Sequence, residues 1–122
     1  MKIYAESSAV VAWLLGQSGG VDAGGLLVRA DNVIASQLTI AECNRVLVRL
    51  HAMGRLDTAQ VSERLVLLDG KSARWSLQAI DPDILGRVRQ PFPAEPIRTL
   101  DAIHLASALA ARASIEIGRA HV

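Results

Sequence analysis

Short apolar runs alternate with longer helical patterns along the chain. Residues 2–5 form a β-prone run that breaks at residues 6–8, and residues 9–15 are apolar on every side. This pattern predicts a strand, a cap and a buried helix. Residues 16–25 are rich in turn formers, an apolar face resumes at 26–28, and residues 32–35 predict a second short strand.

Helical spacing is clearest in the middle of the chain, over residues 38–53. The apolar positions of this segment recur at helical spacing and are Cys43, Val46, Leu47, Leu50 and Met53. Ser36 or Thr39 is expected to cap this helix, and Gly54 to end it. A second helix is predicted over 58–68, ending at Gly70, so that the two form a helical hairpin.

The remaining third of the chain predicts further alternation. A strand is expected at 74–77, a helix opening at 81–82 with proline at its first position, and an irregular segment through Pro96. Thr99 is expected to cap a helix from residue 100 to about 111, and residues 114–117 to form a final strand. This order predicts an α/β fold in three layers, α/β/α, with a central, mainly parallel sheet and a site at the carboxyl ends of its strands.

Composition narrows the class of protein. A chain of 122 residues that is 51% hydrophobic and 20% charged predicts a single folded domain over residues 1–122. Its apolar runs are too short for a membrane span, and its single cysteine, Cys43, suits a reducing compartment, so a cytoplasmic protein is expected. Only four aromatic residues are present, which disfavours modules that stack nucleic-acid bases.

Two acidic residues are placed where ligands bind in α/β folds. Glu6 follows the first strand and precedes a helix, so it is either a site residue or a surface acid beside a capping serine. Glu42 follows the second strand, but residues 39–42 also fit a capping box, with Arg45 available for an ion pair. Taken alone, a structural role for Glu42 is favoured.

A third acid, Asp101, opens the last long helix. The helix is apolar almost all round, and a buried carboxylate is costly unless it is paired or bound to a metal, so a functional role is favoured. His104, one turn later, could hold Asp101 in place, but an ordinary half-buried histidine is favoured.

Together these three carboxylates suggest a site for a hard cation. Acids gather at one edge of a sheet when Mg²⁺ or Mn²⁺ offsets their charge, and such ions support phosphoryl-transfer chemistry. An α/β domain in which three acids each cap a helix explains them separately, but makes their common location a coincidence.

Three segments resemble the motifs of PIN-domain ribonucleases, in particular the VapC-type toxins of bacterial toxin–antitoxin pairs. They are residues 3–10 (IYAESSAV), 38–42 (LTIAE) and 98–106 (RTLDAIHLA), in an order and spacing that match from residue 1 to about 112. The resemblance implies a PIN-like fold, cleavage of RNA by a metal-activated water, Mg²⁺ or Mn²⁺ as cofactor, a homodimer, and a cognate antitoxin protein as inhibitor. Carried onto this chain, it implies Glu6, Glu42 and Asp101 as metal ligands and catalytic residues, supported by Ser8 and His104.

The chain departs from the family pattern at two points. The first motif usually has Asp, where Glu6 stands here, and a fourth acid normally follows the final strand, where this chain has Gly118 and Arg119. Glu116 is a candidate replacement, and the carboxyl-terminal end is expected to be short or atypical. The alternative function is therefore a PIN-fold module that binds RNA or an antitoxin without cutting.

Overall fold

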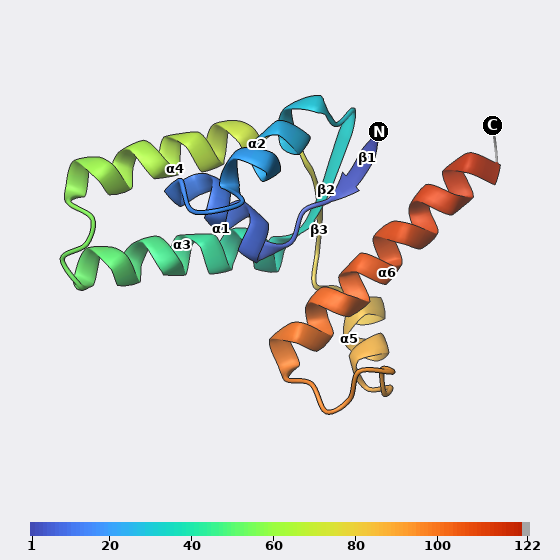
Figure 1. Ribbon diagram of the computed structural model, residues 1–122. Coiled ribbons are helices and arrows are strands. Elements are labelled where there is room, and N and C mark those ends of the chain that lie inside the picture. Colours follow the sequence, from blue (N-terminus) through green and yellow to red (C-terminus); the bar gives the residue numbers. More distant parts are fainter. Residues whose placement is uncertain (121–122) are drawn as a thin grey trace.

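The computed structural model describes the backbone of residues 1–120 and the side chains of residues 1–113 (Figure 1). The elements follow in the order β1 (Lys2–Tyr4), α1 (Ser7–Leu15), α2 (Gly20–Arg29), β2 (Asn32–Ser36), α3 (Gln37–Ala52), α4 (Thr58–Ser72), β3 (Ser76–Gln78), α5 (Pro82–Val88) and α6 (Thr99–Ala120). The predicted alternation of strands and helices, and with it the α/β class, is confirmed.

The strands form one parallel sheet in the order β1-β2-β3. Ile3 pairs with Val33, and Ala35 pairs with Leu77. In β2, residues Val33 to Ser36 are all buried, as expected for the central strand of a sheet that is covered on both faces.

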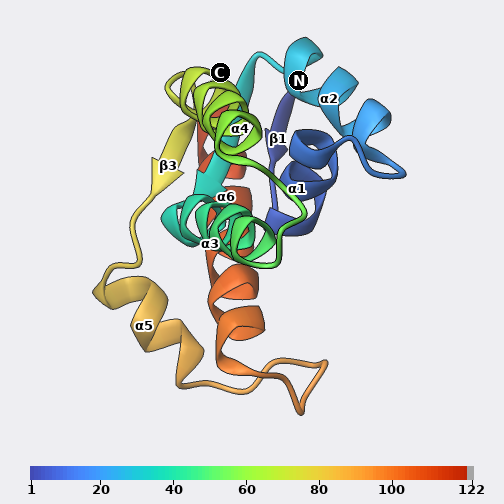
Figure 2. The ribbon, with the colours of Figure 1, turned by 90° about the vertical axis from the view of Figure 1, so that its left-hand side faces the viewer.

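Helices cover both faces of the sheet and enclose two cores. Val33 and Ala35 face a core built with α1, α3 and α4, whose largest fully buried side chains are Leu14, Leu47 and Leu68. A smaller core lies between α5 and α6, around Ile84, Phe92, Ala102, Ile103 and Ala106. Figure 2 shows α3 and α4 stacked at the front and α6 behind them. The three-layer arrangement, with a parallel sheet at its centre, is therefore as predicted.

The glycine-rich stretch at 16–25 was wrongly predicted as turn alone. Gly16 and Gly19 do have positive φ angles, 66° and 85°, which make the turn after α1. Gly20, however, is the first residue of α2. A glycine is required there because α1 and α2 approach so closely that a Cβ at Gly20 would lie 2.3 Å from the Ala12 carbonyl oxygen. Tight packing of α1 against α2 therefore explains a glycine that the sequence pattern assigns to a loop.

The central hairpin is confirmed with shifted ends. Ser36 caps α3, and its hydroxyl accepts the N–H of Leu38 at 3.1 Å, so Thr39 lies inside the helix and is fully buried. The capping box predicted at 39–42 is therefore wrong. Gly70 does not end the second helix either, because α4 continues through it to Ser72 with helical backbone and no close neighbour at its Cβ position.

The last part of the chain differs most from expectation. The strand predicted at 74–77 begins two residues later, as β3, and the strand predicted at 114–117 is wrong, because α6 runs from Thr99 to Ala120. Five alanines between positions 106 and 113 give this segment a high helix propensity, and no breaker interrupts it before Gly118. None of the helices within residues 1–120 combines the length and hydropathy that a bilayer crossing requires.

Candidate active site

Glu6 lies at the carboxyl end of β1, where its side chain caps α1. Its Oε1 accepts the backbone N–H of Ala9 at 3.2 Å and also the hydroxyl of Ser8. The positive end of the helix dipole favours a carboxylate at this position. Oε1 therefore has a structural role, and among the described residues no protein donor reaches Oε2.

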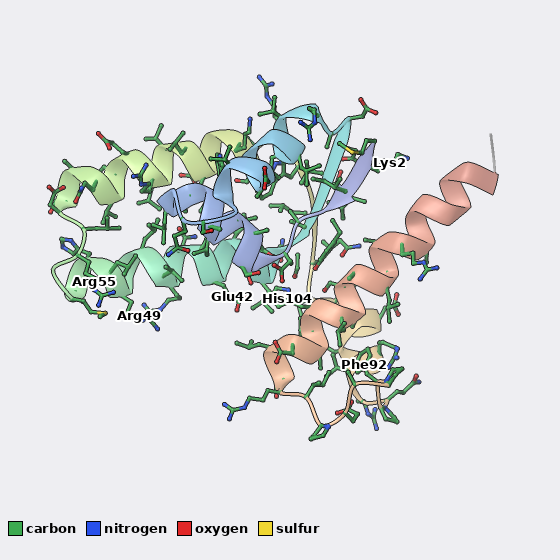
Figure 3. All side chains as sticks on the ribbon, in the orientation of Figure 1. Lys2, Glu42, Arg49, Arg55, Phe92 and His104 are labelled. Atoms are coloured by element: carbon green, nitrogen blue, oxygen red, sulfur yellow. The ribbon has the colours of Figure 1, made fainter. Side chains whose placement is uncertain are left out.

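Glu42 comes from the second turn of α3, and it is partly buried. The Nε2–H of His104, on α6, donates to Oε1 of Glu42, and the side chains of His104 and Glu42 are 17% and 29% exposed respectively. Figure 3 shows these side chains meeting between the two helices. The contact joins the two faces of the fold beside the sheet edge at which Glu6 lies.

His104 also contacts α1, with its Nε2 3.5 Å from the Ser7 hydroxyl oxygen. His104 is partly buried, as favoured, and the less favoured pairing with Asp101 is not formed, because the ring lies against Glu42 and Ser7 instead. The Nδ1 of His104 is buried and has no hydrogen-bond partner among the described residues. Nε2 thus makes both polar contacts of the ring.

Tyr4, on β1, connects the two acids electrostatically. Burial raises the pKa of the Tyr4 phenol, the nearby Ser107 side chain lowers it, and the negative charges of Glu6 and Glu42 raise it further. Geometry links the two acids as well, because His104 contacts both Glu42 and Ser7, the residue after Glu6. Glu6 and Glu42 are brought to the same region of the sheet edge, as their positions after successive parallel strands predict.

Asp101 does not lie in the environment that the sequence predicts. It is exposed, as are its neighbours Leu100 and Leu105, because this side of the first turns of α6 is not covered. Figure 1 shows these turns extending past the sheet beside α5. The predicted burial of Asp101 is therefore wrong, although Asp101 does lie in the first turn of α6, one turn before His104.

The donor chemistry of this region suits a hard cation, but only in part. Glu6 and Glu42 each use Oε1 for protein contacts and keep Oε2 free of protein donors within the described residues, which is typical of carboxylates that can bind Mg²⁺ or Mn²⁺. Nowhere between residues 1 and 113 are three His, Cys, Asp or Glu side chains grouped closely enough to hold a metal ion. Glu6 and Glu42 are therefore suited to bind a hard cation, but among the described residues no third ligand lies close enough to complete the site.

Glu116, the suggested replacement for a fourth acid, lies on α6 rather than on a strand. Its side chain is outside the part of the molecule that the structure describes.

Three further residues of this site, Tyr4, Ser107 and Ser7, carry weaker signals in the sequence. Tyr4 precedes Glu6 by two positions, so strand alternation predicts that both side chains point to one side of the sheet. Ser107 follows His104 by three positions and shares its helix face. Ser7 lies next to Ser8, and only the structure could decide which of the two reaches Glu6 and which reaches His104.

An open groove of about 680 Å³ begins beside Glu42 and follows α3. Most of its lining is apolar, and the lining residues are Leu38, Ala41, Glu42, Arg45, Val46, Val48, Arg49, Ala52 and Leu100. Arg45 and Arg49 are exposed (Figure 3 labels Arg49), and neither has an ion-pair partner among the described residues. The groove therefore combines an apolar floor with unpaired positive charge.

Comparison with known families agrees with this architecture. A model of the PIN domain matches residues 3–115, a span that includes Glu6, Glu42 and Asp101, and the chain therefore belongs to the PIN-domain family. No curated protein matches the chain significantly. PIN domains are generally nucleases that use divalent metals, so the family implies a nucleic-acid substrate.

Proposed function

We propose that this chain is a metal-dependent endoribonuclease and the toxin of a toxin–antitoxin pair of the VapC type. Membership of the PIN family supports a nuclease, and the observation that carries the assignment is that His104 contacts both Glu42 and Ser7, the residue after Glu6, so that the two acids lie at one sheet edge. Residues 1–122 act as a single PIN-like domain in this proposal. We place the protein in the cytoplasm, where RNA is available and where Cys43, the only cysteine, stays reduced.

Three acids would hold Mg²⁺ or Mn²⁺: Glu6, Glu42 and Asp101. Ser8 and His104 support the first two through the hydrogen bonds described above. Asp101 is exposed and makes no hydrogen bond or ion pair among the described residues, so recruiting it breaks no protein contact. When bound, a divalent cation activates water for attack on a phosphodiester and stabilises the charge that develops on the phosphate.

Arginines beside the acids supply the complementary part of a phosphate site. Arg45 lines the groove that begins at Glu42, and Arg98 is exposed immediately before α6. Guanidinium groups bind phosphate oxygens in pairs, which suits contact with an RNA backbone.

Cleavage of a mixed, structured RNA tests the activity. The purified chain is incubated with Mn²⁺, with EDTA, and as the variant Asp101→Asn. We expect cutting that requires Mn²⁺ and is lost in the variant, because Asn keeps the size of the side chain and removes its charge. Cutting that persists in EDTA or in Asp101→Asn contradicts the proposed site.

The toxin role adds two protein partners, a cognate antitoxin and a second copy of the chain. Apolar side chains on the α3–α4 hairpin support such contacts, since Val48, Met53 and Val66 are 50%, 54% and 72% exposed. Induced expression in bacteria should arrest growth, and Asp101→Asn should relieve the arrest. Sedimentation velocity should give a dimer for both proteins, because Asp101 is not part of the hairpin.

A non-catalytic PIN module that binds RNA or an antitoxin is the second candidate. It is favoured by the finding that the described residues contain no group of three side chains able to hold a metal ion. Under this alternative the chain retains RNA or antitoxin but does not cut RNA at any Mn²⁺ concentration. Cleavage and filter-binding assays on the same RNA separate the two functions.

A further inference from the structure

We propose that His104 is a positioning residue for Glu42, an inference that rests on the proposed function. It holds one carboxylate oxygen of Glu42 so that the other is presented to a divalent cation. The sequence pattern linked His104 with Asp101, and the structure redirects the residue to a different acid on a different helix.

The contacts of His104 are suited to this role. Its Nε2–H donates to Oε1 of Glu42, and the Ser7 hydroxyl oxygen lies 3.5 Å from the same nitrogen. These three side chains come from α6, α3 and α1, so one imidazole fixes Glu42 relative to helices on both faces of the sheet. A glutamate has three rotatable bonds, and a single hydrogen bond from a half-buried ring removes much of that freedom.

Glu42 uses only one of its two carboxylate oxygens for hydrogen bonds to the described residues. No other hydrogen bond or ion pair to Glu42 is present among residues 1–113, so Oε2 has no protein partner. A carboxylate held in this way, with one oxygen on a histidine and one free, resembles the outer-shell arrangement by which proteins orient metal ligands. The partial exposure of Glu42, at 29%, leaves a route for a cation to reach it.

The unpaired Nδ1 argues against a purely structural role. This nitrogen is buried without a hydrogen-bond partner in the described structure, and such an atom destabilises a fold. A side chain selected only to fill the space between α3 and α6 would gain from being apolar. The polar ring is therefore better explained by what its other nitrogen does for Glu42.

Two variants of nearly equal size test the proposal. His104→Gln keeps an N–H donor at the end of the side chain, whereas His104→Met has similar length and no donor. Mn²⁺ affinity is measured by calorimetry on the full chain, and circular dichroism establishes that each variant is folded. We expect Met to weaken Mn²⁺ binding by about 10- to 100-fold and Gln to stay within about threefold of the wild type.

His51→Met is the matched control. His51 also lies on α3 and its Nδ1 contacts the Leu56 carbonyl oxygen at 3.0 Å, but it is exposed and lies at the far end of the helix from Glu42. Its replacement should leave Mn²⁺ affinity unchanged.

A double variant shows whether His104 acts through Glu42. Glu42→Gln alone should weaken Mn²⁺ binding, and adding His104→Met should weaken it no further, because the carboxylate to be positioned is gone. Losses that simply add overturn the proposal, since they indicate independent roles.

The remaining outcomes are also decisive. Equal affinity in the wild type and His104→Met overturns the positioning role while leaving the proposed nuclease intact. Unfolding of both His104 variants assigns the residue to structure and overturns it as well. A wild-type chain that binds no Mn²⁺ contradicts the proposed function itself, and the positioning role with it.

Discussion

Ser8 donates its hydroxyl to Oε1 of Glu6, the same oxygen that accepts the backbone N–H of Ala9 at 3.2 Å. The first acid of the candidate site is therefore also the cap of α1. Its two roles use different atoms, because the cap needs one oxygen and a cation needs the other. Substitutions that preserve the oxygen but change the charge should separate the two roles.

Glu6→Ala should lower the free energy of unfolding by about 1 kcal/mol, because α1 loses its cap. Glu6→Gln keeps a side-chain oxygen as acceptor and should unfold within about 0.5 kcal/mol of the wild type. Its Mn²⁺ affinity should nevertheless fall, because the charge is removed. Urea unfolding and calorimetry measure the two effects.

Glu63→Ala is the control for the Glu6 variants, since Glu63 is exposed on α4 away from the sheet edge. It should change neither stability nor Mn²⁺ affinity. A Glu6→Gln variant that loses as much stability as Glu6→Ala while binding Mn²⁺ normally would refute the separation of roles.

Tyr4 is the only tyrosine, so phenolate absorbance near 295 nm reports on this residue alone. Burial raises its pKa above 10.0, and the charges of Glu6 and Glu42 raise the pKa further. Glu42→Gln should therefore move the titration of Tyr4 to lower pH than in the wild type. An identical pKa in the two proteins would mean that Glu42 does not lie near the phenol.

The raised pKa of Tyr4 also sets the direction of a stability change at high pH. The folded chain holds the phenol proton more tightly than the unfolded chain does, so this contribution is complete below pH 10.0. It is lost as the pH rises from there through the pKa of the folded state. Tyr4→Phe should remove this part of the pH dependence of unfolding, and urea unfolding at several pH values measures it.

The sequence predicted what periodicity and topology determine. The helix containing Cys43 and Leu47, the strand around Ile34, and the placing of Glu6 and Glu42 at one sheet edge follow from apolar spacing and parallel order. It could not predict the partner of His104. Asp101 is a turn away on the same helix, whereas Glu42 is 62 positions distant, and only the packing of α6 beside α3 decides between them.

The solvent exposure of side chains on α6 is the second property that the sequence could not predict. The residues around Asp101 are apolar, and local sequence cannot distinguish a buried apolar face from one left uncovered, such as Leu100 at 50% exposure. The same limit explains why the sequence pattern assigns Gly20 to a turn and Gly70 to a helix end, whereas both lie in helices. Glycine signals a turn, a close approach or neither, and the choice depends on the neighbour that packs against it.

Gly70→Ala and Gly20→Ala should have opposite effects on stability. Gly70 lies within α4 with nothing within 4 Å of a Cβ, so alanine should stabilise the fold by about 0.5–1 kcal/mol through its higher helix propensity. Alanine at Gly20 would clash with the backbone of Ala12 and push α1 from α2, which should destabilise the fold by about 1–3 kcal/mol. Thermal unfolding of the pair measures both, and a stabilised Gly20→Ala would refute the close packing of these helices.

Cys43 should react with a thiol reagent only when the protein opens. Its side chain is fully buried, and burial, aided by the charge of Glu42, raises the pKa of its thiol to about 11. Leu47, one turn further along α3, is 1% exposed, and Leu47→Ala should lower the free energy of unfolding by about 2–5 kcal/mol. Reaction with a chromogenic disulfide at pH 8 should therefore accelerate by at least about 30-fold, since 1.36 kcal/mol corresponds to a factor of ten.

Val48→Ala, at a residue that is 50% exposed, should leave the rate unchanged. A native chain that reacts as fast as a free thiol would show that α3 does not bury Cys43 against the sheet, and the placement of Glu42 beside it would fail with it.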